Sequence, residues 1–158
     1  MTYRLAAEAT QKRAGRAGEA QAALDQEKRD QLFEDITIPD APSVPHLYCE
    51  ADGLYVKGKG KSIEIKNMLS YTGWEQNGRR VSLTDRQIFS TVESVDAFWE
   101  KGYAAIRYRW DLEGTHVATN ADAASWISTE RVAEIFSEAA SMTHQLDRFH
   151  VKRSIRRG

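Results

Sequence analysis

Two aspartates stand where they could bind a metal ion. Asp52 lies in the apolar stretch LYCEADGLYV (47–56), and Asp122 ends the run THVATNAD (115–122), 70 positions further along. Mg²⁺ takes oxygen ligands and is usually held by one or two carboxylates together with substrate phosphate. A pair of such ions stabilises the attacking and leaving oxygens of a phosphoryl transfer. The two residues therefore suggest a site for Mg²⁺ or Mn²⁺, provided that the fold brings them together.

Each aspartate also has a purely structural interpretation. An Asp before Gly, as in Asp52-Gly53, is common in turns and bulges, and an Asp just before a helix, like Asp122, is a common N-cap. Glu50 shares the strand face of Asp52 by the alternation of side chains and could supplement it. Spacing alone leaves the metal-binding and the structural interpretations open.

The last stretch, MTHQLDRFHVKRSIRRG (142–158), sets Asp147 three residues before His150. A lone histidine is more often a structural hydrogen-bonding residue than a catalyst, so both are expected to be accessory at most. A helix that contacts phosphates would use basic residues like those that follow, although a solvated helix end has the same composition. These candidate DNA contacts are Arg148, Lys152, Arg153, Arg156 and Arg157.

Hydrophobic patterning predicts the elements that must position these residues. Asn77-Gly78 is a strong hairpin signal, and Ser94 is a suitable N-cap. The expected strands cover 47–56, 61–75, 79–92, 115–122 and 143–147, and the expected helices cover 94–112 and 129–140. The order β-β-β-α-β-α-β is that of the ribonuclease H-like core, a mixed sheet whose first strand lies centrally beside the fourth. In that arrangement Asp52 and Asp122 meet at one edge of the sheet, although other α+β folds also begin with a meander.

The region before these elements divides into two parts. Residues 1–36 are rich in Ala, Gln, Glu, Lys and Arg and predict a helical arm, weakened by Gly15 and Gly18. Such an arm either packs on a partner surface or is solvated and frayed. All three prolines fall in residues 37–46, which predicts a linker. The compact α/β unit then covers 47–158.

Composition limits the classes of protein that the chain can belong to. A length of 158 residues allows one domain and an arm. The net charge of −1 excludes a uniformly basic nucleic-acid binder, so any such role needs local patches. The single Cys49 excludes an internal disulfide and suits a reducing compartment. With no signal peptide and no apolar run of about 20 residues, we expect a cytoplasmic protein without a membrane partner.

Four segments together resemble the ISLre family of bacterial insertion-sequence transposases, also catalogued as an uncharacterised transposase-like family. The segments are LYCEADGLYV, YTGWEQNGRRVSLTDRQIFSTVESVDAFWEKGYAAI, TNADAASWI and LDRFHVKRSI. The resemblance implies a DDE-type transposase with a ribonuclease H-like catalytic domain and Mg²⁺-dependent cleavage and transfer of DNA strands. It makes Asp52 and Asp122 the first two catalytic acids, and Asp147 and His150 an accessory element. The partners implied are the ends of the insertion sequence and, as a possibility, further copies of the chain.

The sequence departs from the family pattern in two ways. Ala121 stands where the family commonly has Gly, a small change. The third family acid, a Glu well downstream, has no counterpart, because no Asp or Glu follows Asp147. We therefore expect a truncated core that is incomplete at its C-terminus and inactive alone. The alternative is a non-catalytic, DNA-associated or oligomerising remnant of a transposase.

Overall fold

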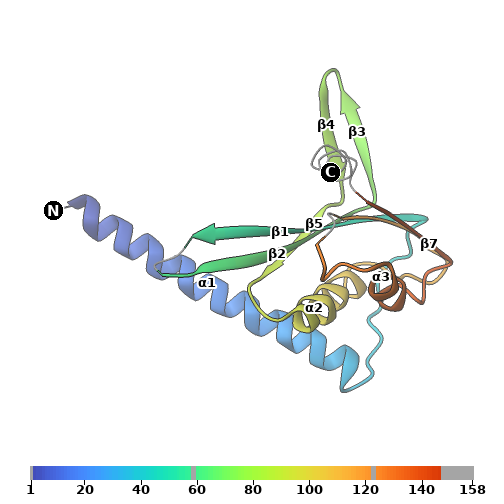
Figure 1. Cartoon of the computed structure of the whole chain (residues 1–158), viewed down its shortest axis with the longest axis horizontal. Helices are drawn as coiled ribbons and strands as arrows, with labels where there is room; N and C mark the ends of the chain where they lie inside the picture. The colour runs from blue at the N-terminus through green and yellow to red at the C-terminus, as the bar shows by residue number, and fades with distance from the viewer. Residues whose placement is uncertain (1, 58–59, 122–123, 147–158) are drawn as a thin grey trace, which may run out of the picture.

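The computed structural model describes residues 2–57, 60–121 and 124–146, with the backbone alone over residues 2–11. Three helices and seven strands form a mixed α/β structure (Figure 1). The helices are α1 (Thr2–Phe33), α2 (Val95–Arg107) and α3 (Thr129–Ile135). The strands are β1 (His46–Lys57), β2 (Ser62–Tyr71), β3 (Gly73–Asn77), β4 (Arg80–Thr84), β5 (Gln87–Thr91), β6 (His116–Ala121) and β7 (Ser141–Leu146).

Five of the strands form one mixed sheet in the order β5-β2-β1-β6-β7. β2 is antiparallel to both β1 and β5, whereas β6 is parallel to β1 and to β7. The sequence-based expectation that the first strand is central and adjoins the strand after the long helix is confirmed. That arrangement brings residues near position 50 next to residues near position 120.

The second and third strands expected from the sequence are each two strands. β2 and β5 belong to the main sheet, whereas β3 and β4 pair only with each other. The break between β4 and β5 falls at Asp85, which has a positive φ of 48° and so reverses the local twist of the chain. The hairpin turn is centred on Gly78-Arg79 rather than on Asn77-Gly78, since Asn77 is paired with Arg80. Gly78 has a φ of 61°, as the first central position of a II′ turn requires.

One face of the sheet packs against helices α2 and α3, and this layer holds the core. Alternation along β1 turns Leu47, Cys49 and Ala51 inward, where they are buried. The helix α2 begins at its expected N-cap, because the Ser94 hydroxyl accepts a hydrogen bond from the Ala97 amide (3.2 Å). Gly102 lets this helix approach the sheet: a Cβ there would lie 2.8 Å from the Met68 methyl group.

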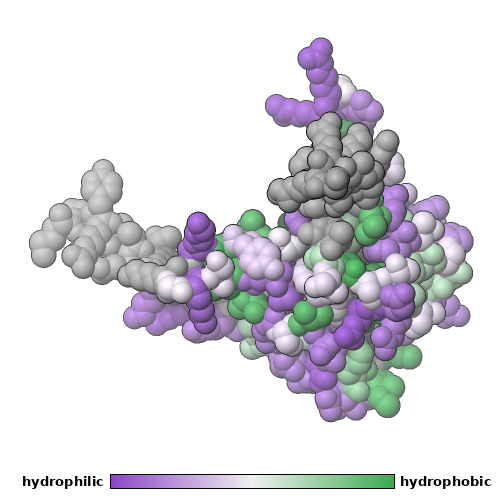
Figure 2. Space-filling model, in the orientation of Figure 1, coloured by the Kyte–Doolittle hydropathy of each residue, from purple (hydrophilic) through white to green (hydrophobic). Residues whose placement is uncertain are grey.

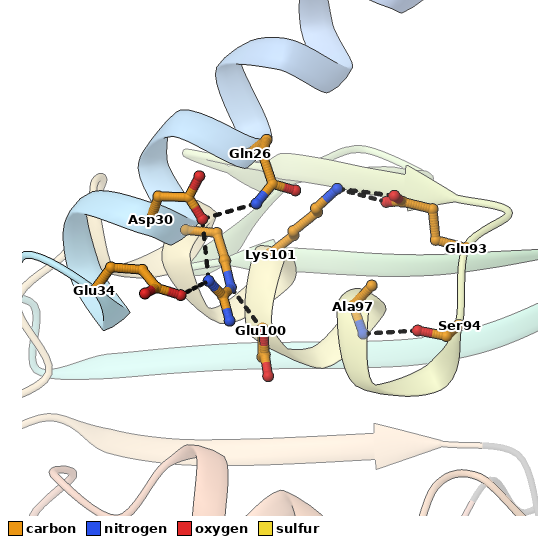
Figure 3. A network of polar contacts seen from close by, with 9 residues as sticks. Gln26, Asp30, Glu34, Glu93, Ser94, Ala97, Glu100 and Lys101 are labelled. Carbon is orange, nitrogen blue, oxygen red and sulfur yellow. Dashed lines mark hydrogen bonds and ion pairs between the residues drawn. The ribbon is translucent and has the colours of Figure 1, made fainter.

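The C-terminal part of α1 packs on the outer side of α2, and the rest extends away from it (Figure 1). Arg29 joins the two helices through an ion pair with Glu100 (2.8 Å) and also contacts Asp30 and Glu34 (Figure 3). The Phe33 ring lies 6.0 Å from that of Tyr103. Residues 12–24 are exposed along all faces of the helix. Among residues 12–33 of the arm, it is therefore the C-terminal part that packs on the α/β unit.

Candidate active site

Three neighbouring parallel strands share one register row, which lies at the carboxyl ends of β6 and β7 and midway along β1. Ala51 of β1 pairs with Ala121 of β6, which pairs in turn with Leu146 of β7. The next residue in the sequence after each of these is an aspartate: Asp52, Asp122 and Asp147. Asp52 is described by the structure, whereas Asp122 and Asp147 lie outside the described residues.

Asp52 lies on the face of the sheet that faces away from α2 and α3, and its side chain is exposed. Its carboxylate accepts a hydrogen bond from the backbone N–H of Gly53 (2.8 Å). The residue opposite on β2 is Asn67, whose side-chain oxygen accepts a hydrogen bond from Ser90 (2.8 Å). A carboxylate with an amide oxygen beside it is a hard donor set, which fits Mg²⁺ or Mn²⁺.

Glu50 shares this face with Asp52, as strand alternation predicts, but it already has a partner. Its carboxylate accepts a hydrogen bond from the Tyr71 hydroxyl (2.8 Å). Burial, followed by this hydrogen bond, raises the pKa of Tyr71 above its ordinary value, so Tyr71 remains a donor at neutral pH. Glu50 is thus engaged in a structural contact beside Asp52.

On the opposite, helix-covered face, a polar cluster supports the backbone next to Asp52. The Trp126 indole N–H donates to the Glu64 carboxylate (3.0 Å), and a Cβ on Gly53 would lie 3.0 Å from that carboxylate and 3.5 Å from the Trp126 ring. Trp126 also packs edge-on against Phe98 at 5.2 Å between ring centroids. A side chain at position 53 would press on the Glu64 carboxylate, so glycine favours this contact. Trp126 therefore links the segment after β6 to Glu64 of β2, next to Gly53 of β1.

Two buried lysines extend this cluster toward α2. Lys66 lies 3.5 Å from Glu64 and donates to the Glu93 carbonyl (3.0 Å). Lys101 donates to both carboxylate oxygens of Glu93, and these hydrogen bonds lower the pKa of Glu93 (Figure 3). Sequence reasoning had no signal for Glu64 or for these lysines, because they come from separate elements and no motif joins them.

A separate acidic cavity of about 500 Å³ lies at the other end of the parallel strands, before β1 and β6 begin. Its carboxylates surround the buried Arg107, which pairs with Asp111 (2.9 Å) and lies 3.2 Å from Glu138 without hydrogen-bond alignment. The other acidic residues in its lining are Asp40 and Glu113. The guanidinium offsets part of this charge, and the cavity is remote from Asp52.

The remaining residues singled out in the sequence cannot be placed. His150, Arg148, Lys152, Arg153, Arg156 and Arg157 lie outside the described residues. Among residues 2–57, 60–121 and 124–146, no group of three or more His, Cys, Asp or Glu side chains is arranged to hold a metal ion. A metal site at the edge near Asp52 thus depends on the two aspartates that follow β6 and β7. No helix in the described part of the chain is both long and apolar enough to cross a membrane.

One known protein family matches almost the whole sequence. The sequence pattern of an uncharacterised protein family (UPF0236) matches residues 3–158. The chain belongs to this family. The resemblance noted from the sequence is confirmed to that extent, and the narrower assignment to the ISLre transposases stays a prediction. None of the curated proteins matches the chain significantly.

Two solved structures show a distant similarity to this member of the family. One is a chain in the cryo-EM structure of a simian T-cell lymphotropic virus intasome in complex with the PP2A regulatory subunit B56 gamma, with 15% identity and a TM-score of 0.37. The alignment covers 75% of this chain but only 40% of the intasome chain. The other is RNase H1 from the halophilic archaeon Halobacterium salinarum NRC-1, with 12% identity, a TM-score of 0.35 and coverage of 67% and 89%.

Proposed function

We propose that this chain carries the catalytic face of a DDE-type DNA transposase of the ISLre type, built on a ribonuclease H-like core. Asp52 and Asp122 would hold a divalent metal ion, Mg²⁺ or Mn²⁺, with Asp147 beside them as an accessory carboxylate. The observation that carries the proposal is the shared row of Ala51, Ala121 and Leu146, each followed in the sequence by an aspartate. Ala51 and Ala121 are both buried on the helix-covered face, so strand alternation favours the opposite face for the carboxyl groups of Asp52 and Asp122.

The bound metal would supply charge stabilisation for phosphoryl transfer to water or to a DNA 3′-hydroxyl. The chain's own residues would position it. The Gly53 amide orients the Asp52 carboxylate, and the Asp52 side chain is exposed, as contact with a DNA backbone requires. Because no Asp or Glu follows Asp147 in the printed sequence, we expect these 158 residues to bind the metal but to show little or no strand transfer by themselves.

Metal titration tests the proposal independently of turnover. Isothermal titration with Mn²⁺ should give one site in the wild type, and Asp52→Asn or Asp122→Asn should weaken it by about 100-fold, since even the outer-shell partners of metal ligands are worth about 10–100-fold. Asp40→Asn, in the remote acidic cavity, is the matched control and should leave affinity unchanged. Equal Mn²⁺ affinity in wild type and in both site variants would refute the proposed site.

The support given by Trp126 leads to a second expectation. Trp126→Ala removes the packing against Phe98 and the hydrogen bond to Glu64, so the segment after Asp122 loses its link to β1 and β2. We expect Mn²⁺ affinity to fall by about tenfold, as for the loss of other outer-shell contacts. Trp126→Phe keeps an aromatic ring against Phe98 but loses the indole N–H, and it should have a smaller effect on Mn²⁺ affinity. Trp74→Ala, which changes an exposed tryptophan, should have none; an equal loss in all three variants would contradict this role for Trp126.

A further inference from the structure

The β3–β4 hairpin has no part in the core. Within the described part of the chain its strands pair only with each other, and nearly all of their side chains are exposed. Figure 1 shows it rising from the sheet on the side opposite to α2 and α3, which is the side of Asp52. Its residues therefore do not contribute to folding as a packed element would.

The base of the hairpin is nevertheless held firmly. The Asp85 carboxylate accepts hydrogen bonds from Arg109 and from the indole N–H of the buried Trp110 (2.8 Å), and the Thr72 amide donates to the Thr84 carbonyl (3.1 Å). The Arg109 hydrogen bond lowers the pKa of Asp85, so the anchor stays ionised at neutral pH. The Trp74 ring lies 5.2 Å from Tyr48 on the open face. These contacts fix the direction in which the exposed ribbon points.

The tip of the ribbon carries side chains of the types that can bind phosphates and base edges. Gln76 and Asn77 end one strand, and Arg79 and Arg80 begin the return, whereas Glu75 is the only acidic residue between positions 72 and 84. Figure 2 shows the tip as a hydrophilic projection from the rest of the surface. Guanidinium groups bind phosphates or guanine, and side-chain amides bind adenine. The local positive charge stands out in a chain whose net charge is −1.

The shape of the ribbon fits one class of partner. The major groove of B-DNA is about 12 Å wide and admits a two-stranded β-ribbon. Tyr48, against which the hairpin base packs, precedes Asp52 on the same face of β1 by about 13 Å of strand, at ~3.3 Å per residue. A duplex held by the hairpin would therefore run across the face that carries Asp52.

We infer that the β3–β4 hairpin is a DNA-binding ribbon that enters the major groove of double-stranded DNA, with Arg79 and Arg80 as its principal contacts. This inference names the surface that would hold the DNA in the proposed function. DNA binding by the hairpin does not need the metal, so the inferred DNA surface and the proposed metal site can each be refuted without the other.

The test is fluorescence anisotropy with a short labelled duplex in EDTA, over a range of salt concentrations. The double variant Arg79→Gln/Arg80→Gln should bind at least about tenfold more weakly and reduce the salt slope by about 1.8, at 0.9 per phosphate contact. The matched control is Arg13→Gln/Arg16→Gln, which removes the same charge from exposed positions on α1 and should retain wild-type binding. A thermal melt of each variant checks folding, which these exposed positions should not disturb.

Three outcomes would overturn the inference. The first is wild-type DNA affinity in the hairpin variant, and the second is an equal loss in the α1 control, which would indicate binding by charge alone. The third is a hairpin variant that still binds DNA but sediments in a different oligomeric state from the wild type. That result would make the hairpin a contact between copies of the chain, through the exposed side chains of Val81 and Trp74. Because DNA binding is measured in EDTA, with no divalent metal bound, loss of the metal site and loss of the DNA surface are distinguishable.

Discussion

Replacing Phe98 by alanine should lower the free energy of unfolding by about 3–5 kcal/mol, the usual cost of removing a buried aromatic ring. Phe98 is fully buried at the centre of the layer between helix and sheet. Its ring contacts those of Phe89 on β5, Trp99 on α2 and Trp126 after β6, at 5.1–5.9 Å between centroids. The surrounding aromatic rings come from three elements, so they are poorly placed to collapse into the cavity.

Urea unfolding followed by tryptophan fluorescence measures this effect. Phe33→Ala is the control, because Phe33 is partly exposed at the end of α1 and contacts mainly Tyr103. Phe33→Ala should lower the free energy of unfolding by clearly less than Phe98→Ala does. A loss of under about 1 kcal/mol for Phe98→Ala would mean that this aromatic cluster does not hold the sheet and α2 together.

Metal binding should stabilise the fold by a similarly large amount. Mg²⁺ or Mn²⁺ at 100 times its dissociation constant should raise the free energy of unfolding by about 2.7 kcal/mol, because the ion binds the folded chain selectively. For a domain of this size the melting temperature should rise by about 5–10 °C, and EDTA should reverse the rise. The effect requires the carboxylate of Asp52, so at the same metal concentration it should fall to about 0.4 kcal/mol in Asp52→Asn, whose affinity is about 100-fold weaker.

Differential scanning fluorimetry with and without metal checks this expectation. The control is Glu50→Gln, which changes a neighbouring carboxylate on the same face that is already bound to Tyr71. That variant should keep most of the metal-dependent rise. If Asp52→Asn were stabilised as much as the wild type, the metal would be binding elsewhere on the chain.

Patterns that act over a few residues were readable from the sequence. Ser94 caps α2 as expected, the strands that carry Asp52 and precede Asp122 are in place, and the hairpin signal near Asn77 marks a real hairpin. Local side-chain chemistry determines each of these features. The exact turn was displaced by one residue because Gly78, and not Asn77, takes the positive φ.

Features that depend on contacts between distant segments could not be predicted from the sequence. The break between β4 and β5 falls at Asp85, whose partners Arg109 and Trp110 lie beyond the next helix. Likewise, Glu64 and Trp126 meet beside Gly53 only because β2 and the loop after β6 converge there. The common row of Ala51, Ala121 and Leu146 needed the pairing register, although the strand order already suggested that Asp52 and Asp122 share an edge.

Paramagnetic broadening in ¹H–¹⁵N NMR spectra, with substoichiometric Mn²⁺, tests the central claim most directly. The acidic cavity around Arg107, at the opposite end of the parallel strands, is the reference region for unspecific binding of the cation. If Asp52 and Asp122 hold the metal, the amide signals of Gly53 and Ala121 should disappear first, while those of Glu113 and Ala139 persist. Early loss of the Glu113 and Ala139 signals with Gly53 and Ala121 unaffected would contradict the account.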